Sequence, residues 1–200
     1  QLPASTAAAA ELARRHERKR LPHGAVLSAG ADRALRHTLE VRHASFETPA
    51  FIALLRKHRV AICVADSDGR WPRIEDLTAD FVYCRLHGHS RVYASGYSPQ
   101  ALDHWAQRVE RWRRGGEPAD ARRLEPDRAA RARDARDVYV YFDNDSKVRA
   151  PYDAINLAAR LYGTARVTFP RRAARVRAEA PRTSWEAWRR RPARGEARAR

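Results

Sequence analysis

Four short apolar segments lie along the middle of the chain, and each one ends in polar or ionisable residues. They are LRHTLEVRH (35–43), RVAICVAD (59–66), FVYCRLHG (81–88) and DVYVYFDND (137–145). Near-continuous apolar runs of this length are typical of parallel strands buried on both faces, and α/β folds place their chemistry just beyond the carboxyl ends of such strands. The pattern therefore predicts four parallel strands with a candidate site at one edge of the sheet.

Helical patterns with clear start signals lie between and after these strands. They are PAFIALLRKH (49–58), PQALDHWAQRVERW (99–112) and PYDAINLAARLYG (151–163). Thr48 and Ser98 stand where a residue caps a helix, each helix has proline in its first turn, and Gly163 is placed to end the last one. Strands alternating with helices predict an α/β fold whose parallel sheet has right-handed crossovers.

Three segments look less regular. WPRIEDLTAD (71–80) is expected to supply only a turn or two of helix. Residues 113–137 are expected to be an inserted loop with a polar helical piece. Residues 166–200 are rich in arginine and interrupted by proline, so we expect this tail to be mostly disordered.

Length and composition are those of a globular domain that crosses no membrane. With 200 residues and 44% apolar residues, the chain can bury a sizeable core. It has no apolar window long enough to span a bilayer, and its alanine-rich start lacks the basic lead and apolar core of a secretory signal. We therefore expect a cytoplasmic protein.

The net charge of +16 is concentrated at the carboxyl end, where residues 171–200 contain 11 arginines and three glutamates. Only three of the 40 basic residues are lysines, and the arginine excess accompanies abundant alanine, a joint bias that codon composition also produces. A basic tail binds polyanions in a non-specific and salt-sensitive way. Nucleic acid is thus a partner to consider, although no motif of a nucleic-acid reader accompanies the tail.

The two cysteines, Cys63 and Cys84, have no metal-binding spacing. If Asp66 and Arg85 share one face of the sheet, alternation sends both cysteines to the opposite, helix-covered face. We expect them to be buried, reduced thiols.

The strings EVRHASF, VAICVADSDGRWP, TADFVYCRLHG, YASGYS and DVYVYFDNDSKVRAPYDA make the chain resemble the YecE-like family, domain of unknown function 72. The resemblance runs from about Leu35 to Gly163. It implies a TIM-like (β/α)8 barrel, with the four strands as its strands five to eight and QLPAS as the end of strand four. It establishes no activity.

On this resemblance the chain divides into three regions: 1–34, the end of strand four with its following helix or linker; 35–165, a half-barrel with the insertion 113–137; and 166–200, the tail. The family's first half is absent, and a barrel of this type needs about 250 residues. We therefore expect a fragment, an open half-barrel with two unpaired edges that is unstable, aggregation-prone or dimeric in isolation.

Polar and ionisable residues gather at the ends of all four predicted strands. They are Glu40, Arg42 and His43 on the first strand, Asp66 on the second, Arg85 and His87 on the third, and Asp143, Asn144 and Asp145 on the fourth. The carboxyl ends of parallel strands meet at one rim, which is where barrel enzymes work. Alternation places Glu40 with Arg42, and Tyr83 with Arg85 and His87, on one face each.

This set suggests acid–base chemistry on a small anionic or phosphorylated substrate. Glu40 or Asp66 is the candidate base, and His43 and His87 are candidate proton carriers or ligands. Arg42, Arg85 and Asn144 are the candidate substrate-positioning groups, with Asp143 beside them.

Several alternatives stay open, including whether the protein is an enzyme at all. The same carboxylates and histidines suit a divalent metal, although the neighbouring arginines disfavour one, and we assign neither a metal nor a cofactor. Pairs such as Glu40 with Arg42 also occur as ion pairs that only fill a barrel. A non-catalytic binder of nucleic acid or nucleotide, and a fragment without function, are the other interpretations.

Overall fold

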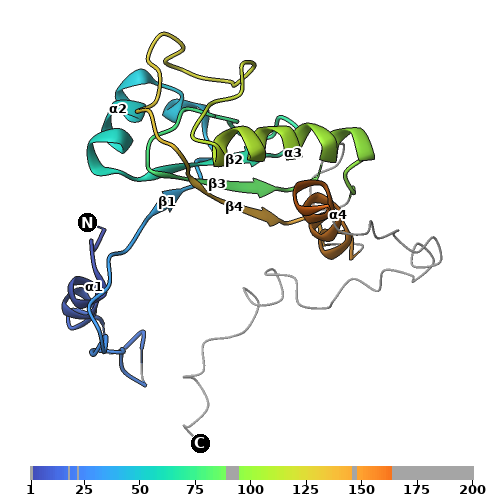
Figure 1. The fold of residues 1–200 in the computed structure, drawn as a ribbon. Helices are drawn as coiled ribbons and strands as arrows, with labels where there is room; N and C mark the ends of the chain where they lie inside the picture. The colour runs from blue at the N-terminus through green and yellow to red at the C-terminus, as the bar shows by residue number, and fades with distance from the viewer. Residues whose placement is uncertain (1, 18, 22, 89–94, 146–147, 164–200) are drawn as a thin grey trace, which may run out of the picture. The chain divides into compact units, whose positions relative to one another are not determined.

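The computed structural model describes residues 2–17, 19–21, 23–88, 95–145 and 148–163 (Figure 1). All of them belong to the first of the two units into which the chain divides, Gln1–Thr168. The elements are α1 (Thr6–Ala13), β1 (Thr38–Leu39), the 3₁₀ turn η1 (Ala44–Phe46), α2 (Pro49–His58), β2 (Ala61–Asp66), β3 (Phe81–Leu86), α3 (Pro99–Arg113), β4 (Asp137–Phe142) and α4 (Ala150–Tyr162). The arginine-rich tail of the sequence prediction lies outside the described residues.

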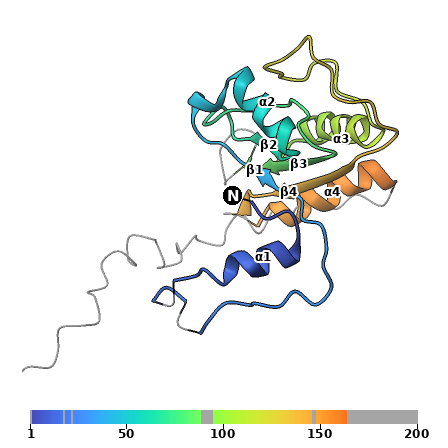
Figure 2. The same cartoon turned by 90° about the vertical axis from the view of Figure 1, so that its left-hand side faces the viewer.

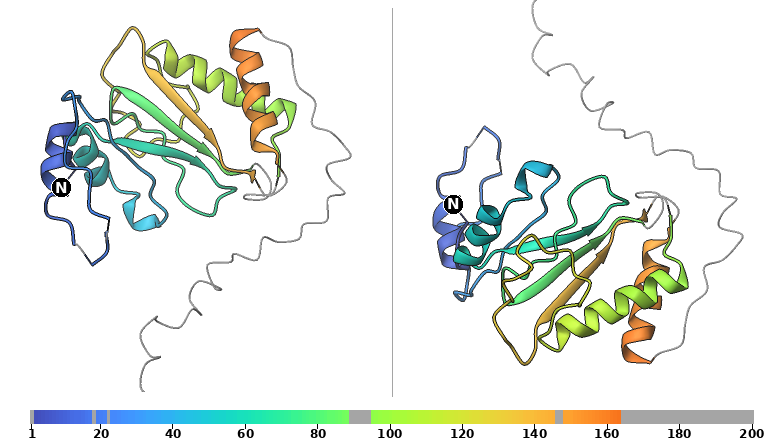
Figure 3. Two further views of the ribbon diagram at one scale, coloured as in Figure 1. Left: turned by 90° about the horizontal axis from the view of Figure 1, so that it is seen from below. Right: turned by 90° about the horizontal axis from the view of Figure 1, so that it is seen from above.

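The four strands form one parallel sheet in the order β1-β2-β3-β4, which confirms the predicted α/β fold and its parallel sheet. Both views in Figure 3 show β2, β3 and β4 side by side and running in the same direction. The first strand is much shorter than predicted, because its pairing with β2 ends at Leu39. As an edge strand, β1 has a ladder on one side only, so ending it early costs few backbone hydrogen bonds.

The helices cover one face of this sheet. On that face Val64, Val82 and Leu86 pack against Trp105 and other buried residues of α3 and α4. A second apolar cluster joins Ile52 and Leu55 of α2 to Ile62 of β2 and to three neighbouring buried side chains. The opposite face carries exposed aromatic side chains from β4.

The predicted helix boundaries are confirmed by their capping geometry. The Thr48 hydroxyl accepts a hydrogen bond from the backbone N–H of Phe51, and the Ser98 hydroxyl accepts one from that of Ala101. Gly163 follows α4 with a φ of 71°, a left-handed conformation that glycine adopts without steric strain.

The helical turns predicted within 71–80 and 113–137 are absent, so this prediction was wrong. The backbone N–H of Glu75 donates to the carbonyl of Arg122 at 2.8 Å. The fully buried Asp76 carboxylate accepts from the backbone N–H groups of Leu124 and Glu125, at 2.7 and 3.1 Å. Backbone groups that a helix would pair internally are thus used to join the two segments, which fastens the insertion to the loop after β2.

The amino-terminal segment folds back on itself around α1. Figure 2 shows the chain leaving α1, turning, and coming back alongside it. Ser5 and Ala34 form an antiparallel bridge there, and Asp32 accepts a hydrogen bond from the backbone N–H of Ala7 at 2.9 Å. Among the described residues, no helix is both long and apolar enough to cross a membrane.

The packing of α2 on the sheet provides a stability test. Ile52 is 0% exposed, whereas Leu54 on the same helix is 52% exposed. We expect Ile52→Ala to lower the free energy of unfolding by about 2–5 kcal/mol, because it removes buried methyl groups and leaves a cavity. Leu54→Ala should change it by less than about 0.5 kcal/mol. Urea unfolding followed by circular dichroism measures both, and equal losses would contradict this packing.

Candidate functional site

Five of the predicted site residues lie together at the carboxyl edge of the sheet, and we call them the rim cluster. They are Glu40, Arg42, Arg85, His87 and Asp143. The His87 ring lies between two carboxylates, with Nε2 2.7 Å from Glu40 Oε1 and Nδ1 3.0 Å from Asp143 Oδ2. The Arg85 guanidinium donates to the same two carboxylates, and Arg42 donates to Glu40 Oε2 at 2.9 Å. One imidazole and two guanidinium groups are thus joined through two carboxylates.

Strand alternation and register explain this convergence. Arg85 and His87 are two residues apart along β3 and its extension, so they point to the same face of the sheet. The register pairs Arg85 with Tyr141 of β4, and Asp143 follows two residues later on the same face. Glu40 comes from the end of β1, across the small Cys63 and Ala65 of β2. This is the face that the helices leave uncovered.

The members of the rim cluster differ in their access to solvent. The His87 side chain is 0% exposed and that of Glu40 is 14% exposed, whereas those of Arg85 and Asp143 are 29% and 33% exposed. A molecule arriving from solvent therefore meets Asp143, Arg85 and the edge of Glu40, while His87 supports both carboxylates from beneath.

The surroundings of Glu40 favour its ionised form. Partial burial acts to raise the pKa of this carboxyl, but hydrogen bonds from Arg42 and His87 and the charge of Arg85 outweigh it, so the pKa is lowered from its ordinary value of 4.5. Glu40 is therefore a carboxylate at neutral pH, able to accept a proton or a hydrogen bond.

Two further predicted site residues, Asp66 and Asn144, lie in a second group on the helix-covered face, which we call the buried cluster. The Tyr97 hydroxyl donates to Asp66 Oδ2 at 3.0 Å and accepts from the backbone N–H of Gly88 at 3.1 Å. Asn144 Nδ2 donates to Asp153 Oδ2 at 2.8 Å, and that same oxygen accepts from the backbone N–H of Tyr97 at 3.1 Å. These bonds hold the carboxyl ends of β2 and β4 to α4 and to the loop before α3.

Burial changes the ionisation of this cluster. It raises the pKa of Tyr97, which keeps the hydroxyl protonated and able to donate to Asp66. It also raises the pKa of Asp153, although hydrogen bonds from Asn144 and from the backbone of Tyr97 act in the opposite direction.

The separation of the two clusters corrects the expectation that Asp66 and Arg85 share a face. The register pairs Ala65 with Arg85 and Asp66 with Leu86, so Asp66 points toward the helices. For the same reason Cys63 lies on the face of Arg85 and only Cys84 lies on the helix side. Both cysteines are buried and free as predicted, and burial raises the pKa of Cys63 to about 12.

The eighth predicted residue, His43, is in neither cluster. Its Nδ1 lies 2.8 Å from the Ser45 hydroxyl and accepts a hydrogen bond from the backbone N–H of Ser45, so the ring caps η1. His43 is exposed, and it lines a cavity of about 610 Å³ beside the rim cluster. We call this the basic cavity, because five arginines line it together with His43.

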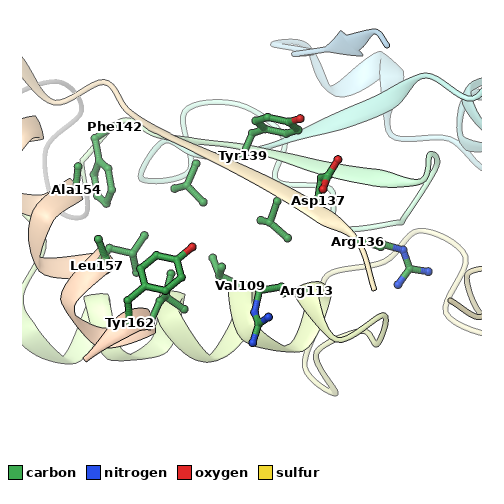
Figure 4. A pocket seen from close by; sticks show the side chains of 13 residues that line it. Val109, Arg113, Arg136, Asp137, Tyr139, Phe142, Ala154, Leu157 and Tyr162 are labelled. Carbon is green, nitrogen blue, oxygen red and sulfur yellow. The ribbon is translucent and has the colours of Figure 1, made fainter. Parts of the chain in front are cut away.

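A second cavity, of about 430 Å³, lies between β4 and the helices α3 and α4. Figure 4 shows Phe142, Ala154 and Leu157 around it, with Arg136 and Asp137 at one end. Its lining is mostly apolar and contains no histidine or cysteine. Its lining therefore has the carboxylate of Asp137 but not the imidazole that the rim cluster has.

No group of three histidine, cysteine or acidic side chains within the part of the chain that the structure describes is arranged to hold a metal ion.

Sequence reasoning missed Tyr97, Asp153 and Trp71 as structural partners of the site. Asp153 stands in the first turn of α4, where an acidic residue is common, so it gave no signal of its own. The ring of Trp71 lies edge to face with that of His87 at 5.0 Å, and the Arg42 guanidinium lies 4.6 Å from its centroid. Only the fold brings these residues beside the rim cluster.

The family model described as protein of unknown function DUF72 matches residues 1–178. No curated protein matches the chain.

Three solved structures of DUF72 family proteins are similar to the chain. One from Thermotoga maritima is 23% identical with a TM-score of 0.49, covering 64% of this chain and 46% of that one. Two from Enterococcus faecalis are 16% and 17% identical with TM-scores of 0.48 and 0.45; they cover 68% and 66% of this chain, and 49% and 50% of theirs. The chain thus spans about half the length of the structures it matches.

The lowered pKa of Glu40 predicts how the rim cluster responds to acid. A glutamate whose pKa is lower in the folded state stabilises the fold above its ordinary pKa of 4.5, and this contribution is lost as the pH falls through the lowered value. We expect Glu40→Gln to be less stable than the parent at neutral pH, with the difference shrinking in acid. Urea unfolding at a series of pH values measures it. Glu47→Gln, a change at an exposed glutamate, is the control, and a difference between parent and Glu40→Gln that stays constant with pH contradicts the prediction.

The buried cluster predicts a structural effect of Tyr97→Phe. The substitution removes only the hydroxyl and leaves the Asp66 carboxylate and the Gly88 N–H without that partner. We expect a loss of about 1–3 kcal/mol in the free energy of unfolding, the usual result of leaving a buried polar group unpaired. Tyr162→Phe is the matched control, because Tyr162 is 73% exposed and should tolerate the same change. Equal stability of the two variants would show that these hydrogen bonds contribute nothing.

Proposed function

Because the chain belongs to the DUF72 family of proteins of unknown function, its chemistry has to be inferred from the site, and we propose that the rim cluster performs acid–base catalysis on a small anionic substrate. The observation that carries this proposal is the His87 ring held between two carboxylates, with two guanidinium groups beside them. Carboxylates, an imidazole and arginines at the carboxyl edge of a parallel sheet are the groups that such enzymes use.

The proposed roles follow the exposure of each group. Glu40 is the general base, because its lowered pKa keeps it ionised. Asp143 is the second carboxyl of the site and is the more exposed of the two to solvent. His87 positions both carboxylates, because its Nε2 lies 2.7 Å from Glu40 Oε1 and its Nδ1 lies 3.0 Å from Asp143 Oδ2. Arg85 and Arg42 bind the anionic group of the substrate.

A hydrolytic reaction fits these roles. Glu40 takes a proton from water as the oxygen of that water forms a bond to the electrophilic centre of the substrate. The bond to the leaving group then breaks, and the proton held by Glu40 passes to the departing oxygen. The guanidinium of Arg85 offsets the negative charge that develops in the transition state.

We extend the proposal to the architecture around the site. A parallel sheet in sequential strand order, with helices on one face only, is the arrangement of a barrel wall, whereas a doubly wound sheet has helices on both faces. We therefore propose that the four strands are strands five to eight of a (β/α)8 barrel. The uncovered face, with Tyr139 36% and Tyr141 52% exposed, would line its interior. The rim cluster then belongs to the catalytic end of that barrel.

The remaining predicted residues have supporting roles in this proposal. Asp66 and Asn144 are nine-tenths or more buried in the buried cluster, so they hold the loops rather than touch the substrate. His43 caps η1 instead of joining the rim cluster. The alternative of nucleic-acid binding through residues 171–200 concerns a segment outside the described residues.

The proposal is tested by turnover of chromogenic esters, namely p-nitrophenyl phosphate, bis(p-nitrophenyl) phosphate and p-nitrophenyl acetate. We expect Glu40→Gln to lower kcat/KM by about 10²–10⁴-fold, the usual contribution of a general base. His58→Asn is the control, because His58 is exposed at the end of α2, away from the rim cluster. A parent protein that turns over none of the three esters, or a Glu40→Gln variant as active as the parent, contradicts the proposal.

The pH profile separates catalysis from a mere ion-pair network. His87 helps to lower the pKa of Glu40, so His87→Leu should raise that pKa and move the acidic limb of the rate profile to higher pH. Loss of stability alone lowers the amount of active protein without moving this limb. An unchanged limb in His87→Leu would remove the assignment of Glu40 as the base.

A further inference from the structure

The basic cavity is built from three segments that are distant in the sequence. It is lined by residues from 42–47 after β1, from 65–73 at the end of β2 and in the loop after it, and from 122–124 in the insertion, and its volume is about 610 Å³. This volume is within the range of small-molecule sites.

The loop after β2 is held in a fixed conformation that shapes this cavity. Ser67 is buried, and its hydroxyl accepts from the backbone N–H of Trp71 and donates to the carbonyl of the same residue, at 3.2 and 3.3 Å. Asp68 and Gly69 between them have φ values of 53° and 76°. The turn projects Arg70 and Trp71 as cavity-lining residues.

The charges that line the cavity are strongly unequal. Five arginines and one histidine stand against a single acidic residue, Glu47. Two of the arginines have a close acidic partner: Arg42 pairs with Glu40 at 2.9 Å, and Arg73 pairs with Glu75 at 2.7 Å. Arg123 pairs with Glu117 at the longer distance of 3.7 Å.

The other two of the five cavity arginines are Arg70 and Arg122, and their charges are not offset in this way. Within the described ranges of the chain, neither has an acidic side chain at ion-pair distance, and both are exposed. Like charges gathered around one hollow repel each other, and an anion bound between them relieves that repulsion. Arginine is the residue best suited to such binding, because its planar donors match phosphate and carboxylate oxygens in pairs.

The cavity is also connected to the rim cluster. Arg42 belongs to both, and the Trp71 ring contacts the Arg42 guanidinium at 4.6 Å and the His87 ring at 5.0 Å. Trp71, Pro72 and Leu124 give the lining apolar surface beside the charges. A ligand with an anionic group in the cavity and an organic body along Trp71 would extend toward Glu40.

We propose that the basic cavity binds the phosphate group of a small phosphorylated substrate, with Arg70 and Arg122 as the ion-pair partners of the phosphate. The inference rests on the proposed function, since it names the substrate class of the same site. This phosphate serves as a handle for binding and is distinct from the group that Arg85 and Arg42 hold at the rim cluster, where the reacting bond lies.

The experiment measures binding of inorganic phosphate by isothermal titration calorimetry. We expect the parent to bind phosphate in the millimolar range and Arg70→Gln/Arg122→Gln to bind it at least about tenfold more weakly, as loss of two charge-assisted contacts implies. Arg15→Gln/Arg33→Gln is the matched control, because it removes the same charge from exposed arginines outside the cavity. It should bind phosphate within about twofold of the parent.

Three outcomes overturn the inference: no binding by the parent, equal binding by parent and cavity variant, or equal weakening in both double variants, which indicates a general charge effect. Because Arg70 and Arg122 are exposed, both substitutions should leave the fold intact. Arg70→Lys/Arg122→Lys, which keeps the charge, should recover part of the affinity, and no recovery counts against direct ion pairing.

The variant Glu40→Gln distinguishes a failure of this inference from a failure of the proposed function. It removes the proposed base, leaves Arg70 and Arg122 in place and frees Arg42 of one acidic partner, so it should bind phosphate at least as tightly as the parent does. If Glu40→Gln keeps both turnover and phosphate binding, the proposed catalysis fails while the anion site stands. If it loses turnover and the cavity variant still binds phosphate normally, the anion site fails while the catalysis stands.

Discussion

The register between β2 and β3 is the constraint on which the rest of the site depends. It pairs Ala65 with Arg85 and Asp66 with Leu86. Successive residues of a strand point to opposite faces, so this pairing directs Arg85 to the uncovered face and Asp66 to the face under the helices. A shift of one residue would exchange these two side chains and place a guanidinium among Trp105, Trp112 and Leu157. The apolar packing of the helix face therefore fixes the position of the charges on the other face.

The two polar clusters have different roles because they differ in their exposure to solvent. In the buried cluster the Tyr97 hydroxyl and the Asn144 amide each connect segments far apart in the sequence, and these bonds fasten the loops that follow β2, β3 and β4. In the rim cluster the carboxylates of Glu40 and Asp143 stay partly open to solvent and are held by Arg85 and His87. The first cluster stabilises the edge of the sheet, and the second presents ionised groups there.

The insertion between α3 and β4 contributes to the site through backbone contacts. Asp76 binds two backbone N–H groups of this segment, and the Arg108 guanidinium pairs with the fully buried Glu75 at 2.6 Å. These buried charges are satisfied, so the segment is fixed where Arg122 and Arg123 line the basic cavity. An insertion without a regular element thereby supplies positive charge to a cavity whose other walls come from the loops after β1 and β2.

The sequence by itself determined the α/β class, the four strands, the helix caps and the edge of the sheet where ionisable residues gather, because these depend on local periodicity and on capping chemistry. It also identified all five members of the rim cluster, since alternation along a strand is a local rule. The tertiary structure alone decided which candidates meet. Asp66 and Asn144 went to the buried cluster because register is set by packing between strands, and His43 was used to cap η1. The basic cavity and the partners Trp71, Tyr97 and Asp153 were equally out of reach, because their neighbours come from segments that only the fold brings together.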